Sequence, residues 1–264
     1  MLTISEIVHP LRCYSKKNVL PKLNATIQKN VVVSLTTTPV RIKKIWPTLN
    51  SIMRQSERPE KIYLWLPKQF KRFPHHTIDQ LPDFIKNNPL IHVAFIDKDF
   101  GPATKLLPCL QFLAGQDKKI IVIDDDRIYS QHLIRDLLRY ERIEPSSAIG
   151  IAGVVIMGSN RRDYIATKKI ALVDVLLGYQ GYLVKPQFFS EEIFEYPNDL
   201  PEAFFEDDVW ISGHMQKRGI RRVLIPSKPS GHSHMLRDKT SFSLCKHENK
   251  DKQNFMGVFN YFKP

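Results

Sequence analysis

Three consecutive aspartates near the middle of the chain, Asp124, Asp125 and Asp126, are the residues best suited to chemistry. They directly follow the apolar residues 120–123 in the segment KKIIVIDDDRIYS. Adjacent carboxylates repel one another and resist full ionisation unless a cation lies among them. Mg²⁺ or Mn²⁺ would remove that cost, because both ions favour oxygen ligands and bind one or two carboxylates together with substrate phosphates. The alternatives are a solvated acidic loop, or an N-cap for a helix that begins near Ser130.

A second acidic cluster, Glu206, Asp207 and Asp208, precedes the segment VWISGHMQKRG. Acidic residues at the start of a helix interact favourably with its macrodipole, and this explains one acid well but three poorly. A carboxylate at a helix start can also act as a general base toward a nearby hydroxyl. Asp208, or alternatively Asp207, is therefore a candidate catalytic base.

Basic and imidazole side chains supply further candidates. Lys105, in GPATK, is predicted to lie in the first turn of a helix, where an ammonium and free backbone N–H groups favour a phosphate. Arg41, four residues after Thr37, is a similar candidate, and for both residues a solvated surface position is the alternative. His232 and His234, in SGHSHM, could supply one more metal ligand, although a surface histidine pair is more often inert.

The elements that must position these residues alternate between strands and helices. Strands are expected at residues 30–39, 60–67, 90–97 and 118–126, and helices at 41–55, 101–113 and 130–145. Such alternation predicts a mostly parallel sheet, in which ligands bind beyond the carboxyl ends of the strands. Residues 36–38, 97–105 and 124–126 should therefore meet at one rim.

The second half of the chain is less regular. Strands are expected within residues 148–158, 173–189 and 221–226, and a helix should follow the second acidic cluster and end near Gly219. The polar tail, residues 231–255, is expected to form a mobile loop.

Composition restricts the classes of partner. The chain has 264 residues, of which 42% are hydrophobic and 25% charged, and its formal net charge is +12. A basic chain favours an anionic partner, which could be nucleic acid, a membrane surface or a phosphorylated small molecule. The basic residues are scattered and no nucleic-acid motif appears, so nucleic acid is not expected.

Cysteine use and hydropathy suggest a location. Cys13, Cys109 and Cys245 lie far apart, which favours a reducing compartment over a disulfide framework. The first residues lack the pattern of a signal peptide, and no apolar run approaches the ~20 residues of a membrane span. The expectation is a cytoplasmic protein, with any membrane contact peripheral and at the inner face.

The ordered motifs resemble a known family. The segments VVVSLTTTPVRI, DFGPATKLLP, IIVIDDD and EDDVWISGHMQKRG, in this order, look like a GT-A fold glycosyltransferase of the family-2-like kind, with a DxD motif. The resemblance spans about residues 30–235. It implies a single α/β catalytic domain with a Rossmann-like, mostly parallel central sheet flanked by helices. Residues 28–127 would form the nucleotide-sugar-binding half and residues 128–264 the acceptor-binding half.

The same resemblance implies roles at the donor site. Thr36, Thr37 and Arg41 would line the nucleotide pocket. Asp99 and Lys105 would lie near the base or the diphosphate. Asp124 and Asp125 would contact the ribose or the donor sugar.

It also implies the metal site and the chemistry. Asp126 would bind Mn²⁺ or Mg²⁺, with His234 or His232 as an additional ligand. Asp208, or less favourably Asp207, would deprotonate the acceptor hydroxyl. A base on the face opposite the leaving diphosphate implies inversion at the anomeric carbon. The implied activity is metal-dependent transfer of a hexosyl unit from a nucleotide-diphosphate sugar, most simply a UDP-sugar, to a hydroxyl of a glycan or glycolipid.

Two other functions compete with this one. A haloacid-dehalogenase-like, Mg²⁺-dependent phosphatase also carries an apolar strand that ends in D-x-D and a later acidic pair. Three expected strands precede the aspartates here, and Arg127 and Ile128 follow them instead of a small pair, so this fit is poorer. The net charge alone is also compatible with a non-enzymatic module that binds an anionic ligand or nucleic acid.

Overall fold

The structure, a computed structural model, describes residues 4–14, 25–164, 167–227, 233–235 and 251–263. The strands are β1 (Thr26–Thr36), β2 (Glu57–Pro67), β3 (Ile91–Ile96), β4 (Lys119–Val122), β5 (Arg127–Tyr129), β6 (Ala148–Gly150), β7 (Gly153–Met157), β8 (Asn160–Tyr164), β9 (Ala171–Leu172), β10 (Val175–Leu176), β11 (Tyr182–Val184), β12 (Arg222–Leu224) and β13 (Ser233–Met235). The α-helices are α1 (Ile4–Tyr14), α2 (Trp46–Met53), α3 (Asp83–Lys86), α4 (Leu107–Phe112), α5 (Leu133–Glu141), α6 (Asp207–Lys217) and α8 (Asp251–Tyr261). Short 3₁₀ segments are η1 (Ile42–Lys44), η2 (Gly101–Lys105), η3 (Gly178–Gln180), η4 (Pro186–Phe188), η5 (Glu191–Phe194) and η6 (Pro201–Phe204).

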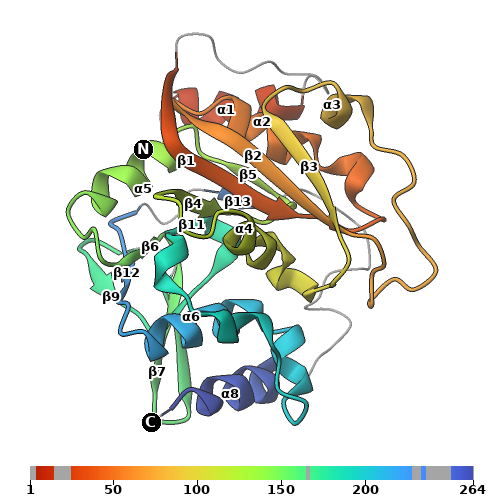
Figure 1. Ribbon diagram of the computed structural model, residues 1–264. Helices are drawn as coiled ribbons and strands as arrows, with labels where there is room; N and C mark the ends of the chain where they lie inside the picture. Colours follow the sequence, from red (N-terminus) through yellow and green to blue (C-terminus); the bar gives the residue numbers. More distant parts are fainter. Residues whose placement is uncertain (1–3, 15–24, 165–166, 228–232, 236–250, 264) are drawn as a thin grey trace.

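The central sheet joins eight of the described strands in the order β3-β2-β1-β4-β11-β6-β12-β9. The first four strands run parallel, and β6 and β12 are also parallel. Strand β11 runs antiparallel to both β4 and β6 and so joins the two parallel blocks, while β9 is an antiparallel edge. Figure 1 shows this twisted sheet through the middle of the molecule. The expected mostly parallel sheet is confirmed.

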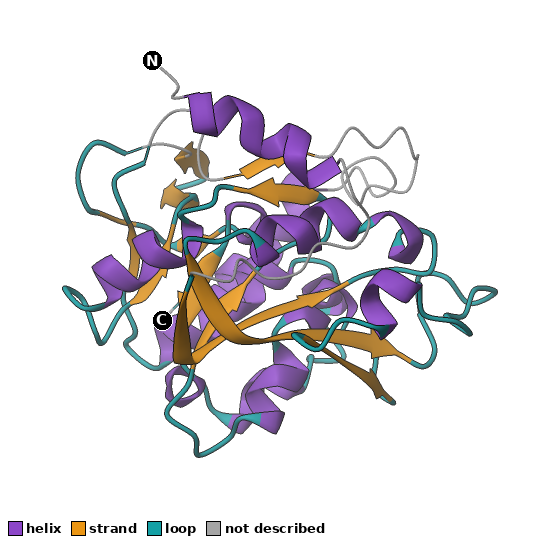
Figure 2. Cartoon of the chain, turned by 90° about the horizontal axis from the view of Figure 1, so that it is seen from above, coloured by secondary structure: helices purple, strands orange, loops and turns teal. Residues whose placement is uncertain are grey.

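Strand alternation divides the core between the two faces of the sheet. In β1, Val31, Val33 and Leu35 pack on the face covered by α2 and α5. Val32, one residue out of phase, packs on the other face, with the buried side chains of α4, α6 and α8. Successive side chains of a strand point to opposite faces, so a run of valines supplies both cores. Helices therefore cover both sides of the strands (Figure 2).

Two expected helices begin later than the sequence suggested. The segment 41–55 is divided into η1 and α2, and the segment 101–113 into η2 and α4. Pro47 and Pro108 each lie in the first turn of an α-helix, because proline has no N–H to donate to the preceding turn. Lys105 is consequently the last residue of η2 and not part of the first turn of an α-helix, so that prediction is corrected.

The helix expected at residues 130–145 is also shorter. Strand β5 follows the aspartates directly, and α5 begins only at Leu133. No side-chain hydrogen bond caps α5, and the alternative that the aspartates cap a helix from Ser130 is therefore wrong.

The tail differs from its expected loop in two places. Ser233, His234 and Met235 form β13, which pairs antiparallel with β5, and α8 begins at Asp251. Pairing with a strand about 100 residues earlier in the chain is a long-range interaction that a polar composition does not reveal. Residues 236–250 lie outside the described part of the chain. No helix within the described ranges combines the length and apolar character needed to cross a bilayer.

Candidate functional site

A cavity of about 510 Å³ opens at the carboxyl ends of β1 and β4. Its walls include the predicted donor-site residues Thr36, Thr37, Arg41, Asp99, Lys105, Asp124 and Asp125. They also include Asp126 and the two candidate bases, Asp207 and Asp208. The prediction that residues 36–38, the 97–105 loop and the aspartate run share one rim is confirmed. His232 lies outside the described residues. Of His234 only the backbone is described, paired opposite Ile128 of β5.

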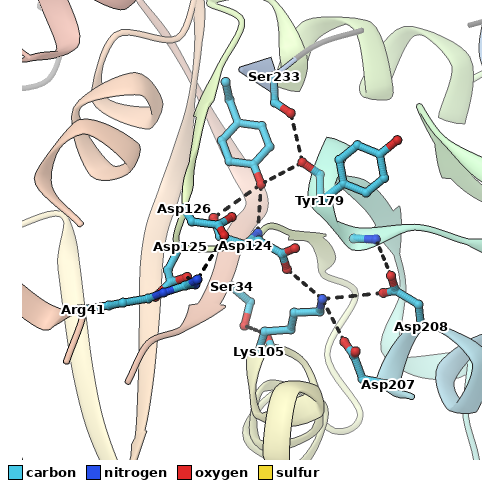
Figure 3. A network of polar contacts seen from close by, with 12 residues as sticks. Ser34, Arg41, Lys105, Asp124, Asp125, Asp126, Tyr179, Asp207, Asp208 and Ser233 are labelled. Atoms are coloured by element: carbon cyan, nitrogen blue, oxygen red, sulfur yellow. Dashed lines mark hydrogen bonds and ion pairs between the residues drawn. The ribbon is translucent and has the colours of Figure 1, made fainter. Parts of the chain in front are cut away.

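Lys105 links the two acidic clusters. Its side chain is 6% exposed, and its Nζ lies 2.7 Å from Asp124 Oδ1, 2.8 Å from Asp207 Oδ2 and 3.5 Å from Asp208 Oδ1 (Figure 3). Burial would lower the pKa of this ammonium, but the three carboxylates outweigh burial and raise the pKa well above its usual value. Ser34 Oγ donates to the Lys105 carbonyl at 2.6 Å and so fixes the end of η2 to β1. Lys105 is therefore a permanently charged centre of the site.

The second cluster stands at the start of α6. Asp207 and Asp208 occupy the first turn, as the helix-dipole interpretation expected, but both also face Lys105. Asp208 Oδ2 accepts the Gly178 N–H at 2.9 Å. Burial raises the pKa of Asp208 to about 7; Lys105 opposes this shift and the neighbouring carboxylates Asp207 and Asp124 add to it. The Asp208 side chain is 22% exposed and that of Asp207 only 11%, so Asp208 is the more accessible base.

Arg41 neutralises the other end of the aspartate run. Its Nη1 lies 2.8 Å from Asp125 Oδ1 and its Nη2 lies 3.3 Å from Asp126 Oδ2. Thr37 Oγ1 donates to the remaining oxygen of Asp125 at 2.5 Å. Both Asp125 oxygens are therefore occupied within the protein. Although burial raises the pKa of Asp125, Arg41 and Thr37 oppose that shift.

Asp126 is the least compensated member of the run. Burial and the charges of Asp125 and Asp124 raise its pKa to about 6, and Arg41 offsets this only in part. Its side chain remains 32% exposed at the cavity wall. A local excess of negative charge beside an accessible carboxylate is the environment that a divalent cation relieves.

The described residues contain no group of three His, Cys, Asp or Glu side chains placed to hold a metal ion. Asp126 nevertheless fits a magnesium or manganese ion of the kind that binds one or two carboxylates and takes its other ligands from water and substrate phosphates. A test of Asp126 as a metal ligand therefore needs a phosphate-bearing ligand to be present together with the metal ion.

Tyr129 positions the aspartate run, and the sequence analysis missed it. Its hydroxyl accepts the Asp124 N–H at 2.9 Å, and the ring is fully buried. Thr48 Oγ1 donates to the Asp125 carbonyl at 2.8 Å, and Ser51 Oγ accepts the Tyr129 N–H at 3.0 Å. Helix α2 and strand β5 thus hold the backbone of the run from two sides. None of these three contacts leaves a motif in the sequence.

Asp99 holds together the loop that lines one side of the cavity. Its two carboxylate oxygens accept the Lys71 and Gly101 N–H groups, each at 2.8 Å. Phe70 and Phe73 line the same region and were not predicted. Asp99 therefore has a structural role, because it holds the loop that forms this part of the cavity wall.

Residues 127–255 contribute a further part of the cavity wall that the sequence analysis also missed. The Arg127 guanidinium lies 4.4 Å from the centroid of the Tyr179 ring, and the Arg161 guanidinium lies 4.4 Å from that of Phe255. All four residues line the cavity together with Asp208. They come from β5, η3, β8 and α8, which are distant in the sequence.

Comparison with known proteins finds similar solved structures. No family model matches the sequence, and a search of curated proteins finds no match. A crystal structure of GalNAc-T7 with UDP, GalNAc and Mn²⁺ is similar, with a TM-score of 0.53 and 14% sequence identity. The match covers 84% of this chain and 46% of that chain, so this chain spans about half of its length. At this identity the likeness concerns the fold, and the chain has the mixed α/β, GT-A-like fold of a glycosyltransferase neighbour.

Proposed function

We propose that this protein is a metal-dependent glycosyltransferase that moves a hexosyl unit from a nucleotide-diphosphate sugar, preferably a UDP-sugar, to a hydroxyl of a glycan or glycolipid. The observation that carries the proposal is the meeting of two acidic clusters around Lys105 at the carboxyl ends of the strands. Ligands of open α/β sheets bind at such ends. The GT-A-like fold and the UDP and Mn²⁺ of the neighbouring structure agree with it.

The donor would lie along the β1 and β4 ends of the cavity. Thr36, Thr37 and Arg41 would face the nucleotide, with Asp99 and Lys105 near the base or the diphosphate. Asp124 and Asp125 would face the ribose or the sugar. Asp126 would hold Mn²⁺ or Mg²⁺, with His234 or His232 as a further candidate ligand. When bound, that ion neutralises charge on the diphosphate.

Asp208 would act as the base, with Asp207 as the alternative. Its carboxylate would take the proton of the acceptor hydroxyl while the hydroxyl oxygen bonds to the anomeric carbon and the bond to the diphosphate breaks. This single displacement inverts the anomeric configuration. A pKa of about 7 suits a group that must accept a proton near neutral pH.

The buried free thiols and the net charge of the chain are the basis for a proposed cellular location. Cys13 and Cys109 are buried free thiols, as expected in a reducing compartment. We therefore propose a cytoplasmic enzyme, and its net charge of +12 suits peripheral contact with an anionic membrane face that carries a glycolipid acceptor.

A sugar-nucleotide screen tests the proposal. Thermal stability would be measured with UDP-, GDP- and dTDP-sugars, each with Mn²⁺ and with EDTA. We expect stabilisation by one nucleotide class, stronger with Mn²⁺, and release of the free nucleoside diphosphate on turnover. Release of orthophosphate from p-nitrophenyl phosphate, without nucleotide binding, would instead indicate the phosphatase. A salt-dependent gel shift with oligonucleotides would indicate a nucleic-acid-binding module.

A further inference from the structure

The arginine–aromatic wall, defined as Arg127, Tyr179, Arg161 and Phe255, has no part in the chemistry proposed above. Each guanidinium lies over a ring at 4.4 Å from its centroid. A guanidinium stacked on an aromatic face is held in position while the N–H groups at its edge stay free to donate hydrogen bonds. Both arginines line the cavity, so the wall presents two oriented cations to it.

Among the described residues, neither arginine forms an ion pair with the two acidic clusters, although the charge of Arg127 opposes in part the rise that burial causes in the pKa of Asp126. Lys105 and Arg41 pair with the carboxylates of the two clusters. Across the described ranges, no carboxylate oxygen lies within 4.0 Å of the Arg127 guanidinium. Arg161 pairs with Asp163 on the same strand through two hydrogen bonds, from Nε to Oδ1 at 2.7 Å and from Nη2 to Oδ2 at 3.2 Å, and its Nη1 takes no part in this pair. Asp163 does not line the cavity.

The fold holds Arg161 on the cavity side by strand geometry. In the β7–β8 hairpin, Ile156 pairs with Arg161 and Val155 with Arg162. Consecutive side chains of a strand point to opposite faces, so Arg162 lies over Tyr164 and does not line the cavity. Phe255 is 2% exposed and belongs to the core beneath α8, which gives the Arg161 guanidinium a rigid support.

We propose that the arginine–aromatic wall binds an acceptor sugar that carries a carboxylate, phosphate or sulfate group. The inference rests on the proposed glycosyltransferase function. Tyr179, Arg161 and Phe255 belong to the half of the chain that holds Asp208, the proposed base, and Arg127 lies at the boundary of that half. A fork of N–H donors matches a planar or tetrahedral oxyanion. Without such cations, the acidic cavity would repel an anionic acceptor.

The test uses the dead-end complex with UDP and Mn²⁺, so that no donor sugar is needed. Binding of p-nitrophenyl β-D-glucuronide and of the neutral p-nitrophenyl β-D-glucoside would be measured by calorimetry. We expect the glucuronide to bind at least about tenfold more tightly. Arg161→Met keeps the packing but removes the charge, and it should abolish this preference without weakening glucoside binding. Arg161→Lys should restore part of it, and Arg162→Met is the matched control with no effect.

Separate titrations with UDP distinguish the possible failures. If the unmodified protein does not bind UDP with Mn²⁺, the proposed function fails and this inference fails with it. If UDP binds but the glucuronide binds no better than the glucoside, or neither binds, only the acceptor inference is overturned. If Arg127→Met weakens the binding of UDP about tenfold, Arg127 contacts the donor phosphates, and its assignment to the acceptor subsite is wrong.

Discussion

Lys105 Nζ lies 2.7 Å from Asp124 Oδ1 and 2.8 Å from Asp207 Oδ2, and these two contacts join the end of strand β4 to the acidic start of helix α6. Two carboxylate clusters about 80 residues apart in the sequence thus share one ammonium. The ammonium keeps the site assembled before any ligand arrives, because separate acidic clusters would repel one another.

Replacing Lys105 should therefore destabilise the fold. Lys105→Met leaves buried carboxylates without a counter-charge, and removing one partner of a buried ion pair costs about 3–5 kcal/mol. Urea denaturation measures the change. Lys68→Met is the control, because Lys68 pairs with Asp97 at the surface, where an ion pair contributes about 1 kcal/mol or less. Equal stability of the two variants would contradict the structural importance of the Lys105 network.

Asp126→Ala should remove the contribution of the metal to nucleotide binding. The variant should bind UDP equally with Mn²⁺ and with EDTA, whereas the unmodified protein should bind more tightly with Mn²⁺. Calorimetric titration of UDP under both conditions measures this difference. Asp97→Ala, at an exposed carboxylate outside the cavity, should behave like the unmodified protein. A Mn²⁺ dependence that survives in Asp126→Ala would exclude Asp126 as the ligand.

Asp208→Asn should separate donor binding from transfer. The amide cannot accept the proton of the acceptor, so kcat should fall about 10²- to 10⁴-fold while UDP affinity is retained. Asp199→Asn, at an exposed loop residue, is the control. Proton NMR of the product reports its anomeric configuration. Full activity of Asp208→Asn would move the base to Asp207 or elsewhere, and a retained configuration would rule out a single displacement with Asp208 as its base.

The pH dependence of kcat follows from the raised pKa of Asp208. The carboxyl is protonated below about pH 7 and ionised above it, and only the ionised form accepts a proton. kcat should therefore fall as the pH is lowered from 8 to 5.5, approaching about a tenfold loss per pH unit, because below its pKa the ionised fraction of a carboxyl falls about tenfold per pH unit. Asp208→Asn should lose this dependence. A kcat that does not change over this range would contradict the assignment.

Gly178 should be required for the position of the Asp208 carboxylate. A Cβ at this position would lie 2.5 Å from Lys105 Nζ and 3.0 Å from Asp208 Oδ1. Gly178→Ala should therefore displace both side chains and lower kcat. Gly257→Ala in α8 is the matched control, since its Cβ would meet nothing within 4 Å and alanine favours a helix by up to about 1 kcal/mol. Unchanged kcat in Gly178→Ala would show that the site tolerates the displacement.

The strands and their order along the chain could be predicted because apolar runs determine which segments are buried. Residues 30–39, 60–67 and 90–97 correspond closely to β1, β2 and β3. Helix starts were less accurate, since prolines such as Pro47 and Pro108 fit the first helical turn and do not only interrupt a helix. Strand β13 and the antiparallel direction of β11 escaped prediction because each depends on a partner distant in the sequence.

The sequence by itself determined which side chains could do chemistry and that the aspartate run follows a buried strand. Local composition carries that information, because hydrophobic patterning and adjacent charges are properties of neighbouring residues. The tertiary structure alone decided that Lys105 forms ion pairs with both acidic clusters, that Arg41 forms an ion pair with Asp125, and that the Arg161 guanidinium lies over the Phe255 ring. Such contacts form between elements that packing of the two cores brings together. The burial of apolar surface that drives this packing depends on the whole chain, so no short segment predicts it.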